Sequence, residues 1–294
     1  MSRLRTVGLV AGFELYESLR SRKALALILI YVLIAAGATA LFAGIVNELT
    51  AAVMKDVGPE AVDRVLESPA FQERLGQFVG DDALAAELLR VPLLALFYLW
   101  VITAFMPLIM VLTASDAISN KLASGSARFA LFRVDRAGWA LGILAGQAAL
   151  MAVGILAGAL VCWGIGVARL DRVDVVASLL WLLRMSLRGS FYGFAYLGIA
   201  LCASQLVRSN AVARGLALMF AFASFVAGQI FNAMAVRDAS STVGETLHKL
   251  VPSGHATALF RPELTDRSLG MLGLFLIGLA WFGLGFWQLW RRDA

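Results

Sequence analysis

Long apolar runs alternate with shorter polar segments along the whole chain. About 20 consecutive apolar residues in a helix cross a hydrocarbon core of about 30 Å, and the runs are close to this length or longer. The fourth run is too long for one straight span, so we expect its first part, 175–186, to be tilted or interfacial. The pattern predicts one all-α membrane domain with six spans, at 24–46, 91–114, 138–167, 187–203, 215–236 and 269–290.

The segments outside these runs predict further helices. In residues 1–23, Leu4, Val7 and Leu15 recur at helical spacing among basic residues. This indicates an amphipathic N-terminal helix at the membrane surface, and an unstructured basic tail is the alternative. Prolines divide 47–90 and 237–267 into short helix-like pieces. We interpret the first as a small external helical hairpin and the second as an external helical segment that dips back toward the membrane.

Composition agrees with a membrane protein. Hydrophobic residues make up 60% of the chain, charged residues 15%, and the mean hydropathy is +0.81. Soluble domains average about 45–50% apolar and about 25% charged residues. Cys162 and Cys202 both lie in apolar runs, so neither a disulfide framework nor a zinc site is indicated. His248 and His255 lack the tight repeat of a metal site, and we expect no bound metal.

The sequence also lacks the motifs of a nucleotide-using enzyme. It contains neither the phosphate-binding pattern G-x-x-x-x-G-K-S/T nor G-x-G-x-x-G after a strand. No serine, histidine and acid set occurs in the spans with the spacing of a hydrolase. We therefore expect the chain to be no enzyme and to hold no cofactor. If the protein uses nucleotide energy, another polypeptide binds the nucleotide.

Basic residues set the expected orientation. If the N-terminus lies inside, the density of Lys and Arg is about twice as high in the inner segments as in the outer ones. The positive-inside rule then predicts that both termini lie in the cytoplasm. Residues 115–136 lie on that side as well.

Residues 115–136, SDAISNKLASGSARFALFRVDR, combine two properties that a simple connection does not need. Lys121 and Arg128 make the segment basic, while Phe129 and Phe132 give it an apolar side. We interpret it as a folded cytoplasmic element. It could dock with its apolar side on a partner, or lie on the inner leaflet, where anionic lipid contributes about 1 kcal/mol per basic residue.

Small and polar residues within the spans predict how the helices pack. Small residues recur four apart at Gly138, Gly142 and Gly146, then at Gly154 and Gly158, which indicates close approach by another span. Amide side chains within or beside the spans are expected to hydrogen-bond between helices: Gln147, Asn210, Gln229 and Asn232.

Two arginines stand close to a predicted span. Arg184 and Arg188 are four residues apart and should share one helical face near the outer boundary. An arginine at mid-membrane costs about 2.5–3.5 kcal/mol on insertion scales. The two side chains could simply extend to the interface, or they could contact an anionic substrate or lipid headgroup as part of a substrate path.

These features together resemble the membrane subunit of a type 2 ABC exporter. The sequence FELYESLRSRKALALILI is similar to that family's pattern of a Glu, then Arg-x-Arg, then the first span, here Glu14, Arg20 and Arg22. The segment LVPSGHATAL resembles the family's Asn-Pro segment before the last span. Within the family, the likeness is nearest to permeases of nitrous-oxide reductase maturation.

Residues 115–136 resemble the first cytoplasmic loop of the same family. The family's pattern is an acidic residue, Gly-Thr, a basic residue, a leucine-rich part and Pro-x-x-Arg, and it falls on Asp116, Gly125, Ser126, Arg128, Leu131 and Arg136. The chain departs from it in three places. Ser126 replaces the usual Thr, no proline precedes Arg136, and Lys121 stands where Glu is common.

The resemblance implies partners and roles. Two copies, or this chain and a paralogue, would pair with two separate ATPase subunits that hold ATP and Mg²⁺, in the cytoplasmic membrane of a bacterium. Contacts with lipids are expected, and contacts with nucleic acid are not. The ATPase-coupling residues would be Asp116, Lys121, Gly125, Arg128, Phe129, Phe132 and Arg136. The alternatives are a secondary transporter or channel, and a non-transporting scaffold or sensor.

Overall fold

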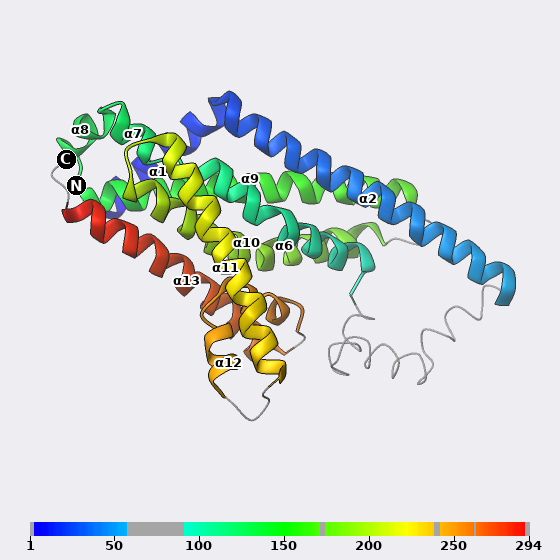
Figure 1. Cartoon of the computed structure of the whole chain (residues 1–294). Coiled ribbons are helices and arrows are strands. Elements are labelled where there is room, and N and C mark those ends of the chain that lie inside the picture. Colours follow the sequence, from blue (N-terminus) through cyan, green and yellow to red (C-terminus); the bar gives the residue numbers. More distant parts are fainter. Residues whose placement is uncertain (1–2, 58–90, 171–173, 238–241, 262, 292–294) are drawn as a thin grey trace.

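A computed structural model describes residues 3–57, 91–170, 174–237, 242–261 and 263–291, and all the regular structure in these residues is helical (Figure 1). The α-helices are α1 (Arg3–Arg20), α2 (Arg22–Val57), α6 (Leu93–Ala114), α7 (Ser119–Ala123), α8 (Ser126–Leu131), α9 (Arg136–Arg169), α10 (Val175–Leu206), α11 (Asn210–Arg237), α12 (Thr242–His248) and α13 (Leu264–Arg291). Two 3₁₀ turns, η1 (Pro252–His255) and η2 (Thr257–Leu259), precede α13. The predicted all-α fold is confirmed.

Five of the described helices are long and apolar enough to cross a membrane: α2, α6, α9, α11 and α13. The remaining predicted span, 187–203, lies inside α10, which is a continuous helix of 32 residues with no break near 186. A helix of that length measures about 48 Å and exceeds the hydrocarbon core. α10 is not among the five, and its neighbours bury nearly all of its residues from Tyr192 to Gln205.

α10 forms the centre of the bundle. It packs most extensively on α13 and α6, and also on α9 and α11. At its contact with α13, a Cβ atom added to Gly198 would collide with the Gly278 backbone, so the two helix backbones touch. Small residues allow such close approach in lipid, where packing rather than water exclusion holds helices together.

The first glycines of the α9 series pack against α1, which is not one of the predicted spans. A Cβ on Gly142 would lie 2.4 Å from the Val10 Cβ, and one on Gly146 would lie 2.6 Å from the Glu14 Cβ. Gly158, later in the series, lies against two spans, since its added Cβ would meet Tyr31 of α2 and Tyr98 of α6. The predicted packing against another span is therefore confirmed at Gly158, whereas Gly142 and Gly146 pack on α1 instead. The N-terminal helix can lie this close because the first turns of α9 present Gly138, Gly142 and Gly146 to it.

The N-terminal helix has two different sides. Val7 and Val10 face α9, as the helical spacing suggested, while Leu4 is 85% exposed. Three further large side chains on the outer side are exposed as well: Leu9, Phe13 and Tyr16. Because residues 3–20 are helical, the alternative of an unstructured tail is wrong.

Both termini lie at the same end of the bundle as α7 and α8, and α12 lies away from that end (Figure 1). The segment predicted to dip back does fold back on the bundle: η1 contacts α11 and α13, and η2 contacts α13. Leu259 and Val251 of this segment are buried. The hairpin predicted at 47–90 falls largely on 58–90, which lies outside the described residues.

Replacement of Gly142 by alanine should push α1 away from α9. The added methyl group meets Val10, and overpacking typically costs about 1–3 kcal/mol. Gly164 is the matched control on the same helix, because nothing lies within 4 Å of its added Cβ. In detergent, Gly142→Ala should lower the midpoint of thermal unfolding, whereas Gly164→Ala should leave it unchanged or raise it. Equal midpoints for both variants would contradict the packing described.

Candidate functional site

The connection between α6 and α9, residues 115–136, is a folded element, and we call it the α6–α9 loop. Gly125 separates α7 from α8 with a φ of 73°, the only positive φ in the described part of the chain. A residue with a Cβ is strained in this left-handed conformation, so the turn depends on glycine. Ala127 and Ile118 are buried in a cluster that includes Trp139 of α9. The loop ends at Asp135, whose carboxylate caps α9 by accepting from the Gly138 N–H at 3.2 Å.

Polar bonds hold α7 against α10 and α11. The backbone N–H groups of Ile118 and Ser119 donate to the Ser204 hydroxyl at 3.0 and 2.9 Å. At the start of α11, Asn210 accepts from the Ser119 hydroxyl and donates to the Asn120 side chain, both at 3.1 Å. The expectation that Asn210 bonds between helices is confirmed, and the first turn of α7 is fixed from two sides.

Asp116 joins three parts of the chain. It accepts from Lys23, at the start of α2, at 2.7 Å, and it pairs with Arg214 of α11 at 2.5 Å. Its side chain is 16% exposed. Removing one partner of a shielded ion pair costs more than removing one at the surface, because the remaining charge is left without compensation. Asp116 therefore connects the loop to α2 and α11, which its place in the sequence did not reveal.

Lys121 connects the loop to the N-terminal helix. Its ammonium group contacts the carboxylates of Glu14 and Glu17 at 2.5 and 2.9 Å. Glu14 is only 4% exposed, and its second oxygen accepts from the Gln147 amide at 2.8 Å. Both oxygens of the buried carboxylate are therefore satisfied. A lysine suits this position, where the resemblance led us to expect Glu, because a third carboxylate here would repel the other two.

The other side of the loop is exposed. Phe129 and Phe132 are 75% and 86% exposed, and Arg128 and Arg133 beside them are exposed as well. No other side chain in the described residues covers these two rings to any large extent. The loop thus has one side fixed by ion pairs and one side that presents two aromatic rings between basic groups.

The other residues singled out in the sequence have different surroundings. The Arg136 guanidinium donates to the Trp290 carbonyl at 2.9 Å and joins the start of α9 to the end of α13. Arg20 donates to the Tyr16 hydroxyl at 2.8 Å, and Arg22 is exposed at the start of α2. Of the three residues in the N-terminal motif, Glu14 is the one whose side chain bonds to the loop in the described part of the chain.

Arg184 and Arg188 do not form a common site. Arg184 is exposed and stacks over the Trp181 ring at 5.1 Å. Arg188 is 9% exposed and donates to the Leu259 carbonyl of η2 at 3.2 Å. The two arginines lie four residues apart on α10, as predicted, but their partners differ because the segment before α13 folds back and covers Arg188.

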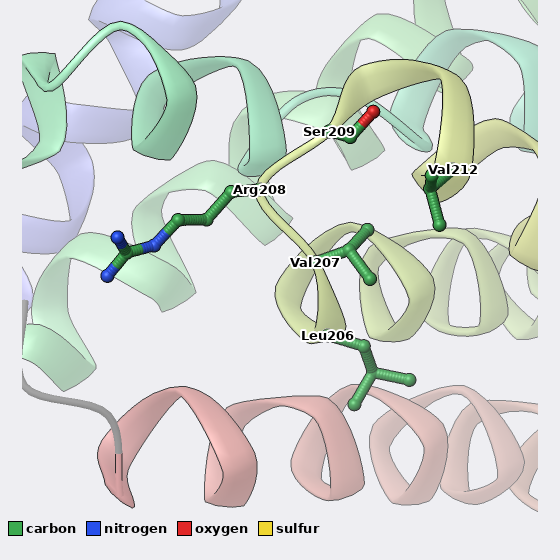
Figure 2. Close-up of a pocket in the computed structure, with 5 residues that line it drawn as sticks. All are labelled: Leu206, Val207, Arg208, Ser209 and Val212. Carbon is green, nitrogen blue, oxygen red and sulfur yellow. The ribbon is translucent and has the colours of Figure 1, made fainter.

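A second connection extends the surface of the loop. The end of α10, the connection and the first turn of α11 line a pocket of about 480 Å³ through residues 206–209 and 212. Figure 2 shows three apolar side chains, Leu206, Val207 and Val212, and Arg208 extending away from them. Because Asn210 bonds to α7, this connection lies beside the loop and adds an exposed basic residue to it. The sequence predicted that Arg208 lies on the same side of the membrane as the α6–α9 loop, but it did not predict that the two connections are adjacent.

A polar cleft lies behind the loop. It measures about 180 Å³ and is lined by charged and polar side chains that include Glu14, Lys23, Asp116 and Gln147. These side chains already pair with one another. Elsewhere, His248 has a lowered pKa because it is partly buried and lies near His255. Among the described residues no three His, Cys, Asp or Glu side chains gather as metal ligands.

Comparison with known proteins identifies the family. The profile described as ABC-2 family transporter protein matches residues 9–290, from the N-terminal helix to the end of α13. No curated protein matches the chain significantly. The matched region includes the α6–α9 loop and all the long helices. The chain therefore belongs to the ABC-2 transporter family, and it is a multi-pass, all-α permease component of an ABC transporter.

Proposed function

We propose that this permease works in an ATP-driven exporter and that its α6–α9 loop docks into a groove on a separate ATPase subunit. That subunit would hold ATP and Mg²⁺. The observation that carries the proposal is the exposure of Phe129 and Phe132, 75% and 86%, on a loop whose other side is fixed to the bundle. Aromatic and arginine side chains dominate the energetics of protein interfaces, and a short helix with apolar anchors suits a groove.

The ion pairs and hydrogen bonds of the α6–α9 loop favour a role in transmitting movement to the spans over simple attachment to lipid. Through Lys121, Asp116 and Ser119 the loop reaches α1, α2, α10 and α11. A displacement of α8 would therefore be passed to four helices at once. A segment that only rests on anionic lipid needs basic residues but does not need this set of connections.

The remaining assignments follow from the sequence. The excess of basic residues supports a cytoplasmic location for both termini and for the loop, in the cytoplasmic membrane of a bacterium. The six predicted spans and the export direction belong to the same proposal, as does the narrower likeness to permeases of nitrous-oxide reductase maturation.

We further propose that a second copy of the chain packs along α11. Gln229 is an exposed amide beside the exposed apolar side chains of Val226 and Ile230, and Asn232 is an exposed amide about one turn further along α11. Within the described residues no hydrogen-bond partner is seen for either amide. Amides of spanning helices commonly bond to a neighbouring helix, and a symmetric pair would place the same groups opposite one another.

The double variant Phe129→Asp, Phe132→Asp should abolish capture of the ATPase. Two carboxylates would replace the apolar anchors without disturbing the core, because both rings are exposed. The measurement is copurification of an ATPase with tagged permease from native membranes, together with ATP-dependent transport. Leu250→Asp is the matched control, since Leu250 is 65% exposed in the turn after α12, away from α7 and α8.

Three outcomes would contradict this proposal. Unchanged ATPase capture by the double variant would exclude the docking role. Transport driven by an imposed ion gradient without any ATPase would indicate a secondary transporter or channel. Capture of an ATPase with no ATP-dependent transport of any substrate would favour the scaffold alternative.

Lys121→Met should release the N-terminal helix from the loop. The buried Glu14 carboxylate would lose its cation, and breaking such a pair costs about 3 kcal/mol or more. The midpoint of thermal unfolding should fall, and adding Glu14→Gln should restore part of it by removing the buried charge. Arg261→Met is the control, because its pair with Asp266 is exposed and should be worth less than about 1 kcal/mol. Similar losses for both single variants would contradict the role of Lys121.

Ile230→Cys should form a disulfide-linked dimer if α11 faces a second copy. Ile230 is 52% exposed, and Leu33 of α2, at 60%, is a control on a uniformly apolar face. The buried Cys162 and Cys202 are first replaced by alanine. Oxidation in membranes followed by a non-reducing gel should show a dimer for Ile230→Cys and a monomer for Leu33→Cys. A dimer from both, or from Leu33→Cys alone, would exclude α11 as the contact.

A further inference from the structure

A groove of about 360 Å³ lies between α6, α10 and α11. Its lining residues are found in the middle of these helices, so the groove lies within the bundle of spans and not at either end. Most of the lining is apolar, including Leu108 of α6 and Phe222 of α11. Tyr192 and Tyr196 of α10 also line it. The volume is within the range of about 300–1,000 Å³ that is typical of small-molecule sites.

The two tyrosines can still donate a hydrogen bond. Their hydroxyl oxygens are 3.4 Å apart, which is longer than the usual 2.5–3.0 Å or so for a hydroxyl pair. A pair of hydroxyls needs only one proton between them, so one O–H is left over. Within the described residues neither hydroxyl is seen to bond elsewhere. A donor without a partner at mid-membrane favours a ligand that accepts a hydrogen bond.

Pro107 adds an acceptor at the same groove. It lies inside α6 and has no N–H, so the Thr103 carbonyl lacks its usual helical donor. The Thr103 hydroxyl donates to the Trp100 carbonyl at 2.9 Å and does not replace that donor. Thr103 and Pro107 line the groove together with the tyrosines. The groove therefore offers a hydrogen-bond donor and a hydrogen-bond acceptor.

The groove carries no formal charge. None of its lining residues is Asp, Glu, Lys, Arg or His. Arg188 lies one turn before Tyr192 but donates to the Leu259 carbonyl. Transfer of an ionised group into such surroundings without a partner is strongly unfavourable. An occupant of the groove must therefore be neutral where it meets these residues.

We infer that this groove binds one lipophilic molecule with an uncharged hydrogen-bonding group, such as an alcohol or ester on a hydrocarbon body. A plain acyl chain would leave the tyrosine donor and the Thr103 carbonyl without partners. An anionic lipid would lack a cation here, because no basic side chain lines the groove. That this ligand is the transported substrate rests on the proposed exporter function, whereas its binding does not.

Photolabelling tests the assignment directly. The full chain is placed in phosphatidylcholine nanodiscs with diacylglycerol that carries a photoactivatable acyl chain. Labelled residues are then located by mass spectrometry. Label should concentrate on 103–111 and 218–225, and unlabelled diacylglycerol should compete for it. Phosphatidic acid with the same photoactivatable chain should label these segments about tenfold less, as expected for a loss of about 1.4 kcal/mol.

Variants test the role of the hydroxyls. Tyr192→Phe with Tyr196→Phe should lower labelling of the groove about two- to tenfold, the effect expected for one hydrogen bond. Tyr31→Phe is the matched control, because Tyr31 forms a similar hydroxyl pair with Tyr98 at 3.3 Å outside this groove. Leu108→Trp should fill the groove and block labelling even if the double tyrosine variant fails to fold.

The same experiment can overturn the inference. Equal labelling by the neutral and anionic probes, or label spread along the exposed side of α2, would show ordinary surrounding lipid only. Crosslinks from the groove to a second copy, with no competition by diacylglycerol, would show that the groove is covered by protein. Because no ATPase is present, failure here leaves the ATPase-capture result intact, and failure of ATPase capture leaves the binding result intact.

Discussion

The buried carboxylate of Glu14 constrains the arrangement of the N-terminal half of the protein. It is 4% exposed and is satisfied by Lys121 of the α6–α9 loop and Gln147 of α9. If α1 moved away from the loop, a charge would remain among apolar groups without its cation, which costs several kcal/mol. α1, the loop and the first turns of α9 therefore behave as one unit. That unit carries the exposed rings of Phe129 and Phe132.

The glycines of α9 make this ion pair possible. Gly146 lies directly under the Cβ of Glu14, and Gly142 lies under Val10. Larger residues at these positions would move α1 outward and draw the Glu14 carboxylate away from Gln147. Helix packing and electrostatics are thus coupled here, since the close approach of the backbones brings the charged groups within bonding distance.

The sequence predicted the long helices well because a helix that crosses lipid must consist mainly of apolar residues. Each long apolar run therefore corresponds to a long helix. The sequence predicted α10 least well, because a helix surrounded by other helices does not need a uniformly apolar surface. The sequence did not predict which residues pair when they lie far apart along the chain. Lys121 and Glu14 are 107 residues apart, and Arg188 and the Leu259 carbonyl are 71 apart. Such contacts depend on how the spans assemble, which no local pattern encodes.

Charged groups gather at one end of the bundle and uncharged polar groups line the groove at its middle. α10 connects these two regions. The ion pairs of Lys121 and Asp116 gather at the end with the termini, whereas the groove at mid-bundle has only hydroxyl and carbonyl groups. α10 holds α7 through Ser204 and lines the groove with Tyr192, about 18 Å away along the same continuous helix. A tilt of α10 imposed through α7 would therefore change the width of the groove between α10 and α11. No charged group would have to cross the membrane interior in that motion, which keeps its energetic cost low.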